Sequence, residues 1–191
     1  MPNWCYNKLE VQGPSRQMHN VFDSVIASQE DFFNIIKPRP ADQEENWYDW
    51  NISNWGTKWD VSPEDVEIID HEDGISTVTT YFDSAWSPPV GIAEYLHELG
   101  LTVRLYYYEP GVGFAGLWDD GFDDCYELSD LTSKEMESQL PPELDEMFNI
   151  SEERRQWEEN DDEFVDWYED GVEERKLKPH NPDDIWGNEK E

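Results

Sequence analysis

The order of hydrophobic patterns along the chain predicts an α+β fold, in which two helices pack on one face of an antiparallel sheet. Segments with strand-like composition flank two segments whose apolar residues recur at helical spacing. Apolar residues make up 37% of the chain and aromatic residues 14%, which is enough to build a core. A chain of 191 residues with this content has room for one domain and an appendage.

The chain is expected to begin with a strand and a helix. Residues Trp4 to Val11 suit a strand, which ends at the turn Gly13-Pro14. Ser15 then caps a helix whose apolar face is formed by Met18, Val21, Phe22, Val25 and Ile26. A short apolar run, Phe32 to Ile36, stops before two prolines, and a long polar segment continues to Asn54.

The next part of the chain contains the remaining elements of the predicted domain. A helix begins near Pro88-Pro89 and ends at Gly100. An Asp-Gly pair at residues 73–74 predicts a hairpin between two of the strands. The strands are predicted at Val66 to Ile69, Ile75 to Phe82, Leu101 to Tyr108 and Phe114 to Trp118. The order is ferredoxin-like β-α-β-β-α-β with an extra strand.

Beyond Ser129, strand-forming residues become rare. A capping box from Thr132 to Glu135 predicts a short helix, which Leu140-Pro141-Pro142 ends. From Glu143 to the end, nineteen acidic residues face six basic ones. We therefore expect residues 1–128 to form the ferredoxin-like domain and residues 129–191 to form an acidic, mainly helical C-terminal extension.

The formal net charge of −33 is the main clue to function. Self-repulsion at this density opposes the compact state, so we expect the field to attract a basic partner. Basic protein surfaces commonly hold nucleic acid, and the leading hypothesis is that the chain imitates a phosphate backbone. The alternative is that the charge serves only solubility. Acidic chains that are disordered or merely solvated usually contain few aromatic residues, whereas this chain contains 14%.

The strongest candidate for such a surface is the acidic stretch Ser151 to Asp170. As a helix it would span about 28 Å with a net of about eight negative charges, close to the linear density of one B-DNA strand. Its aromatic residues either dock the helix on its own core or anchor a partner, and a solvated acidic arm is a third possibility. The candidate partner-binding residues here are Glu152, Glu153, Trp157, Glu158, Glu159, Asp161, Asp162, Glu163, Asp166, Trp167, Tyr168, Glu169 and Asp170.

A second acidic group consists of Asp119, Asp120, Asp123 and Asp124. It does not fit a calcium-binding EF-hand loop, because Gly116 and Trp118 would then fall at positions that require oxygen ligands. We expect a solvated loop that contributes to the negative surface for the partner.

Catalysis and cofactor binding are not expected. The four histidines are scattered, the two cysteines form no ligand set, and phosphate-binding glycine motifs are absent. In the segment NWGTKWD, Trp55 and Trp59 are expected to pack on the sheet, with a small-ligand pocket as the lesser alternative. The sequence has no secretion signal and no membrane-spanning run, so the expectation is a cytoplasmic protein that binds neither membrane nor cofactor nor metal.

Several segments together resemble the YubB-like family of phage and conjugative-plasmid proteins. They are MPNWCYNKLEVQG at the start, IIKPRP from Ile35, NWGTKWD from Asn54, AWSPP from Ala85 and YYEPGVGFAG from Tyr107. The resemblance covers roughly residues 1 to 128 and implies a ferredoxin-like domain and a mobile-element origin, but no established activity. The acidic C-terminal part departs from the family pattern.

The resulting hypothesis is a phage- or plasmid-encoded acidic inhibitor that mimics nucleic acid. It would occupy the basic DNA- or RNA-binding groove of a host protein, with a CRISPR or restriction nuclease as the target class, and would not itself bind nucleic acid. The alternative is a protein–protein interaction module, which uses aromatic patches to bind a host complex such as RNA polymerase without mimicry.

Overall fold

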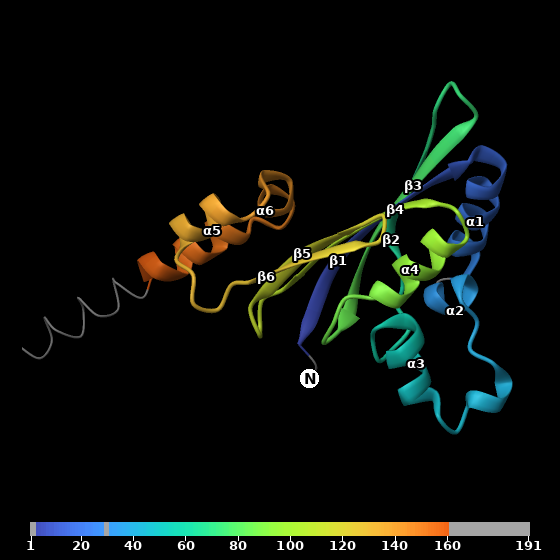
Figure 1. Ribbon diagram of the computed structural model, residues 1–191, viewed down its shortest axis with the longest axis horizontal. Coiled ribbons are helices and arrows are strands. Elements are labelled where there is room, and N and C mark those ends of the chain that lie inside the picture. Colours follow the sequence, from blue (N-terminus) through green and yellow to red (C-terminus); the bar gives the residue numbers. More distant parts are fainter. Residues whose placement is uncertain (1–2, 29–30, 161–191) are drawn as a thin grey trace, which may run out of the picture.

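The computed structural model describes residues 3–28 and 31–160 of the chain. A six-stranded antiparallel sheet with the order β2-β3-β1-β4-β5-β6 forms its centre (Figure 1). The strands are β1 Trp4–Pro14, β2 Glu64–Asp70, β3 Ile75–Ala85, β4 Thr102–Glu109, β5 Phe114–Asp119 and β6 Phe122–Glu127. The helices are α1 Ser15–Ser28, α2 Phe32–Ile36, the short 3-10 helix η1 Ala41–Gln43, α3 Trp47–Trp55, α4 Val90–Glu98, α5 Ser133–Gln139 and α6 Pro142–Phe148. Residues 150–160 are also helical.

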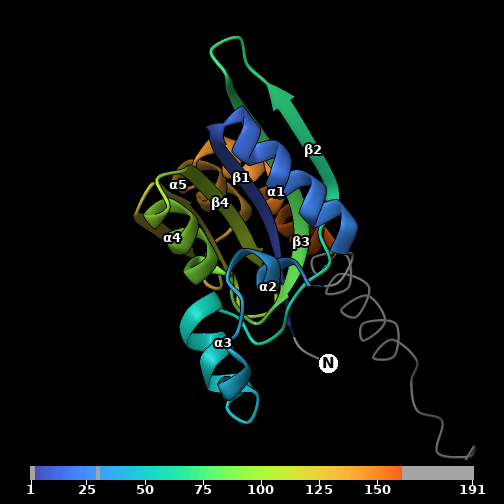
Figure 2. The ribbon, with the colours of Figure 1, turned by 90° about the vertical axis from the view of Figure 1, so that its right-hand side faces the viewer.

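The α+β class and the ferredoxin-like order predicted from the sequence are confirmed. Strands β1 to β4 with α1 and α4 follow the β-α-β-β-α-β order, and α1 and α4 lie on one face of the sheet (Figure 2). Two strands, β5 and β6, extend this unit where the sequence predicted one. The solvated loop expected at Asp119 to Asp124 is limited to the turn at Asp120 and Gly121, because Asp119 ends β5 and residues 122–127 form the edge strand β6. All but one of its residues are exposed, so it lacks the alternation that marks a half-buried strand.

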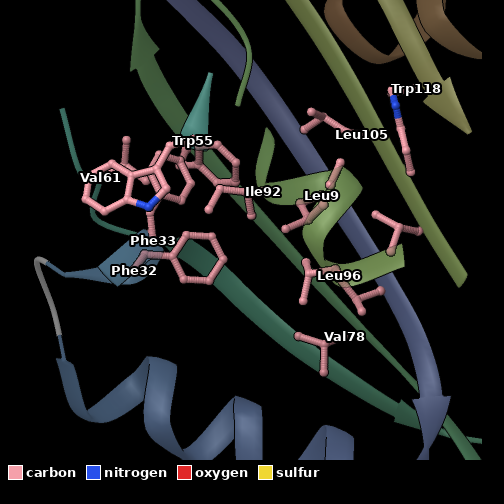
Figure 3. Packing of buried hydrophobic residues seen from close by; sticks show 14 of the residues in the cluster. Leu9, Phe32, Phe33, Trp55, Val61, Val78, Ile92, Leu96, Leu105 and Trp118 are labelled. Atoms are coloured by element: carbon pink, nitrogen blue, oxygen red, sulfur yellow. The ribbon is translucent and has the colours of Figure 1, made fainter. Parts of the chain in front are cut away.

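The first core lies between the sheet and the helices α1, α2 and α4. Leu9 of β1 and Leu105 of β4 pack there with Phe33 of α2 and Ile92 of α4 (Figure 3). Each such apolar side chain contributes roughly 1.5–3 kcal/mol when it is fully buried. This core contains the alternating residues that the sequence assigned to the strands, which is why the central elements were predictable.

A second core lies on the opposite face of the sheet and was not expected. Tyr106 and Tyr108 of β4 point to this face, whereas Tyr107 points to the first core. Helices α5 and α6 and the start of residues 150–160 cover these tyrosines, and Figures 1 and 2 place the two groups of helices on opposite sides of the sheet. The buried members from the C-terminal part are Met136, Leu140, Leu144 and Ile150. The predicted C-terminal part thus begins with elements that pack on the sheet, and the division at residue 128 stays a prediction.

Helix α3 replaces most of the polar segment expected before Asn54. Only Asn51 and Trp55 of this helix are buried, so its sequence shows little helical periodicity. The helix ends at Gly56, whose φ of +89° suits a residue without a Cβ. No helix in the described ranges is long and apolar enough to cross a membrane.

Candidate functional site

Most of the negative charge belongs to residues 1–160. Residues 161–191 hold twelve acidic and four basic residues, which is −8 of the total charge of −33. The remaining −25 lies in residues 1–160, nearly all of which the structure describes. A site based on charge therefore has to be sought over the folded body.

The acidic group at the turn between β5 and β6 is partly structural. Asp119 pairs with an arginine of β4 at 3.3 Å, and Asp120 accepts a hydrogen bond from a β4 backbone N–H at 2.9 Å. The hydroxyl of Tyr107 donates to Asp123 at 2.7 Å. Burial, and then this carboxylate, raise the pKa of Tyr107, so the hydroxyl stays protonated as a donor. Of the four predicted residues, Asp124 keeps an exposed carboxylate with no such contact in the described part of the chain.

The acidic residues of the helical stretch 150–160 have unequal roles. Glu158 accepts hydrogen bonds from the N–H of Ser133 at 2.9 Å and from its hydroxyl at 2.7 Å. These bonds at the start of α5 lower the pKa of Glu158. Glu152 forms an ion pair with Arg155. Glu159 is exposed and makes no polar side-chain contact with any described residue, so it is the carboxylate most open to a partner.

Glu153 and Trp157 line a cavity of about 410 Å³ between this helical stretch and the turn after β4. Burial, and then the charge of Glu153, raise the pKa of Tyr108 in the same cavity to about 12. Trp157 is 56% exposed, and the guanidinium of Arg154 lies 4.8 Å from its ring centroid. Trp157 does not dock the helix in the core, in contrast to the first of the three possibilities given for the aromatic residues of the acidic stretch.

The other candidates of the stretch fall outside the described residues. They are Asp161, Asp162, Glu163, Asp166, Trp167, Tyr168, Glu169 and Asp170. For these residues the partner-binding role stays a prediction.

The structure separates the two acidic groups that the sequence singled out. In the β5–β6 hairpin, Asp119 lies opposite Phe122 at the tip, and Phe114 lies opposite Glu127 at the other end. The two ends are about 17 Å apart at 3.4 Å per residue. Ile150 packs with Leu128, next to the second end. The acidic residues therefore form a distributed surface.

Both edges of the sheet are acidic, a feature that the sequence reasoning missed. The edge strand β2 carries Glu64, Asp65, Glu67 and Asp70, and the edge strand β6 carries Asp123, Asp124 and Glu127. The strings EDVEIID and FDDCYE were the available signal, but their position at sheet edges follows only from strand order. Across five strand spacings of about 4.8 Å, the two acidic edges lie roughly 24 Å apart.

The segment NWGTKWD holds several elements together. Trp55 is buried, and its indole N–H donates to the carbonyl of Lys37 at 3.0 Å. The hydroxyl of Thr57 donates to the carbonyl of Ala85 at 2.9 Å. Trp59, by contrast, is 39% exposed and lines a surface cavity. The expected packing role thus fits Trp55, while Trp59 is available to a ligand.

Among the described residues, no group of three or more His, Cys, Asp or Glu side chains is arranged to hold a metal ion. Cys5 is buried and Cys125 is exposed, and both are free. Burial raises the pKa of the Cys5 thiol, which keeps it protonated and unreactive.

No family model matches the chain, and no curated protein matches it. Among solved structures, the chain is similar to the crystal structure of a protein api92 from Yersinia pseudotuberculosis, of family DUF1281, with 19% sequence identity and a TM-score of 0.34. The match covers 52% of this chain and 40% of that chain. A likeness at this TM-score does not establish a common fold.

Proposed function

We propose that the chain is an acidic inhibitor that imitates nucleic acid and occupies the basic groove of a host nucleic-acid-binding protein. The observation that carries this proposal is the net charge of −25 in residues 1–160, spread over a folded body. A basic groove would release counterions when it binds such a surface, and this release would favour binding, as it does when the groove binds the phosphates of nucleic acid.

The scarcity of basic partners supports the proposal. Residues 1–160 contain thirty-four acidic and nine basic residues, so most carboxylates have no countercharge within reach. Charges on edge strands also prevent sheets from joining edge to edge. That role accounts for a few charges on β2 and β6, but not for those on the helices.

The target class rests on the resemblance to phage and plasmid proteins. A mobile element gains most by blocking a host defence, and defence nucleases of the CRISPR and restriction types hold nucleic acid in basic grooves. The proposed target is such a nuclease, and the proposed location is the cytoplasm of the host cell.

The experiment uses the full chain to capture its target from host cells, followed by binding measurements over a range of salt concentrations. We expect the captured protein to bind DNA or RNA, to be released by duplex competitor, and to lose affinity steeply as salt rises. The chain alone should give no mobility shift with DNA or RNA. Tight binding to bare nucleic acid, or an affinity for the target that is independent of salt, contradicts mimicry.

A matched pair of variants locates the charges that matter. One variant neutralises Glu159, Asp161, Asp162, Glu163 and Asp166 and leaves Glu158 in place, because Glu158 contacts Ser133. The control neutralises five exposed carboxylates elsewhere, namely Asp42, Glu44, Glu45, Glu72 and Glu94. If the C-terminal stretch enters the groove, only the first variant should flatten the salt slope, by about one for each ion pair with the target that it removes. An equal decrease of the slope in both variants would assign binding to the total charge of the body.

The alternative, an aromatic interaction module, is favoured by a separate observation. Five aromatic side chains are exposed around the end of the sheet where β1 begins, and we call them the aromatic patch: Trp4, Tyr6, Trp59, Tyr81 and Trp86. Exposed Trp and Tyr residues are common binding hot spots. Binding through this patch should change little with salt, which separates it from mimicry.

A further inference from the structure

A surface cavity of about 230 Å³ opens where β1 begins and β3 ends. Trp4 of β1 and Trp59 form two of its walls, with ring centroids 6.4 Å apart and ring planes inclined at 48°. Val61 and Ala85 are buried and supply apolar lining. Both tryptophans are partly exposed, at 43% and 39%, so their rings can be reached from solvent.

Three carboxylates complete the lining of the cavity. Asp60 is fixed in place, because it accepts hydrogen bonds from the backbone N–H groups of Phe33, Asn34 and Val61 at 2.7–2.9 Å. Asp83 and Glu64 are exposed side chains on neighbouring strands. Partial desolvation of the carboxylate, and then the charge of Glu64, raise the pKa of Asp83, so a positive charge between the two carboxylates would be favourable.

The described basic residues leave this cavity unfilled, since no Lys or Arg among them lines it. The Trp59 ring nevertheless already contacts one cation, because the ammonium of Lys58 lies 4.4 Å from its centroid. Backbone conformation also singles out this end of the sheet. Trp86 follows Ala85 with a φ of +74° and is 52% exposed. A bulky residue in this region of φ is an outlier that persists only where the surrounding structure holds it.

We infer that this cavity binds the cationic side chain of an arginine or lysine from a partner protein. The aromatic faces attract the cation, the carboxylates balance its charge, and the apolar lining accommodates its methylene stem. An anionic side chain would be repelled by the three carboxylates, and a neutral polar side chain would not balance their negative charge. The cavity shares Glu64 with the acidic edge strand β2 and shares Trp4 and Trp59 with the aromatic patch. Its occupant does not depend on mimicry, although a basic groove would supply such a side chain.

The test titrates the full chain with small probes and follows the indole N–H signals of Trp4 and Trp59 by NMR. The probes are N-acetyl-arginine amide, N-acetyl-lysine amide, the neutral isostere N-acetyl-citrulline amide, and choline. We expect saturable shifts of both signals with the arginine or lysine probe and none with citrulline. Equal shifts with citrulline would overturn the inference, and so would tighter binding of choline, which would indicate a site for small quaternary ammonium ions.

Two variants and one control separate a specific cavity from general attraction to a polyanion. Trp4→Leu removes an aromatic face and keeps apolar bulk, and Asp83→Asn with Glu64→Gln removes two charges. Trp4→Leu should weaken binding of the cationic probe by about two- to fivefold, the factor expected when an exposed cation–π interaction is removed. The double carboxylate variant should also weaken it, because two of the charges that balance the cation are lost. The control, Asp42→Asn with Glu44→Gln, removes the same charge elsewhere and should have little effect. An equal weakening in the control would overturn the inference. Because no target protein is needed, this result is independent of the test of mimicry.

Discussion

At the scale of single residues, the acidic side chains of this protein divide into structural and available ones. Asp145 accepts hydrogen bonds from the N–H and hydroxyl of Ser151 at 2.7 and 2.6 Å, and so caps the start of residues 150–160. Glu158 does the same for Ser133 at the start of α5. Carboxylates are favoured at such positions, because helix N-termini carry unpaired N–H groups and a partial positive charge. Charge alone therefore does not mark a residue as partner-binding.

Glu158→Gln should lower stability in a pH-dependent way. The pKa of Glu158 is lowered in the folded protein by its bonds to Ser133. Its contribution is therefore present above the ordinary glutamate pKa of 4.5 and is lost as pH falls through the lower folded pKa. Urea unfolding at pH 7 should show a lower midpoint for Glu158→Gln than for the parent, and this difference should close as the pH falls well below 4.5. Glu159→Gln is the control and should unfold like the parent. A gap that persists in acid would show that the bonds do not depend on ionisation.

At the scale of elements, the second face of the sheet explains why the C-terminal helices are ordered. Helix α5 has only seven residues and α6 also has seven, too few for stable isolated helices. The capping box at Thr132 and Glu135 fixes the start of α5, as predicted. Packing of both helices on Tyr106 and Tyr108 supplies the rest of their stability.

Leu144→Ala measures that packing. Leu144 of α6 is fully buried in the second core, so its truncation removes apolar packing and leaves a cavity. We expect a decrease of about 2–5 kcal/mol in the free energy of unfolding, measured by urea denaturation. The control Leu99→Ala changes a side chain that is 54% exposed and should cost less than about 0.5 kcal/mol. Similar decreases in the two variants would mean that α6 does not depend on the second core.

At the scale of the whole molecule, net charge opposes folding. A charge of −33 on 191 residues repels itself at every distance shorter than the Debye length. The two cores must offset this repulsion, and the few ion pairs among the described residues are at least partly exposed to solvent and individually weak.

Salt should therefore stabilise the chain. Raising NaCl from about 0.01 M to about 1 M shortens the Debye length from about 30 Å to about 3 Å and screens the repulsion. If screening restores about 1 kcal/mol, Tm should rise by about 2–4 °C. Thermal melting followed by circular dichroism checks this expectation. A Tm that falls steadily with salt would mean that attractive ion pairs outweigh the repulsion.

The sequence by itself determined the central elements of this protein. Alternating residues in β1 and β3 and the helical spacing in α1 are local signals that depend on a face buried in the first core. Gly100 after α4 is a local signal of another kind, because its positive φ of +82° favours a residue without a Cβ. Composition also determined the acidity of the body, because charge is a sum over residues. Strand β6 and helix α3 were missed because few of their side chains are buried, so neither has a hydrophobic period to detect.

Only the tertiary structure decided which acidic residues are free and where the aromatic residues meet. Glu158 is structural because α5, twenty-five positions earlier in the chain, lies beside it. Trp4 and Trp59 form one cavity because β1 and the segment before β2 meet at the same end of the sheet. Such contacts join residues far apart in sequence, and no local pattern encodes them, because they depend on how the strands are ordered and how the chain crosses between them.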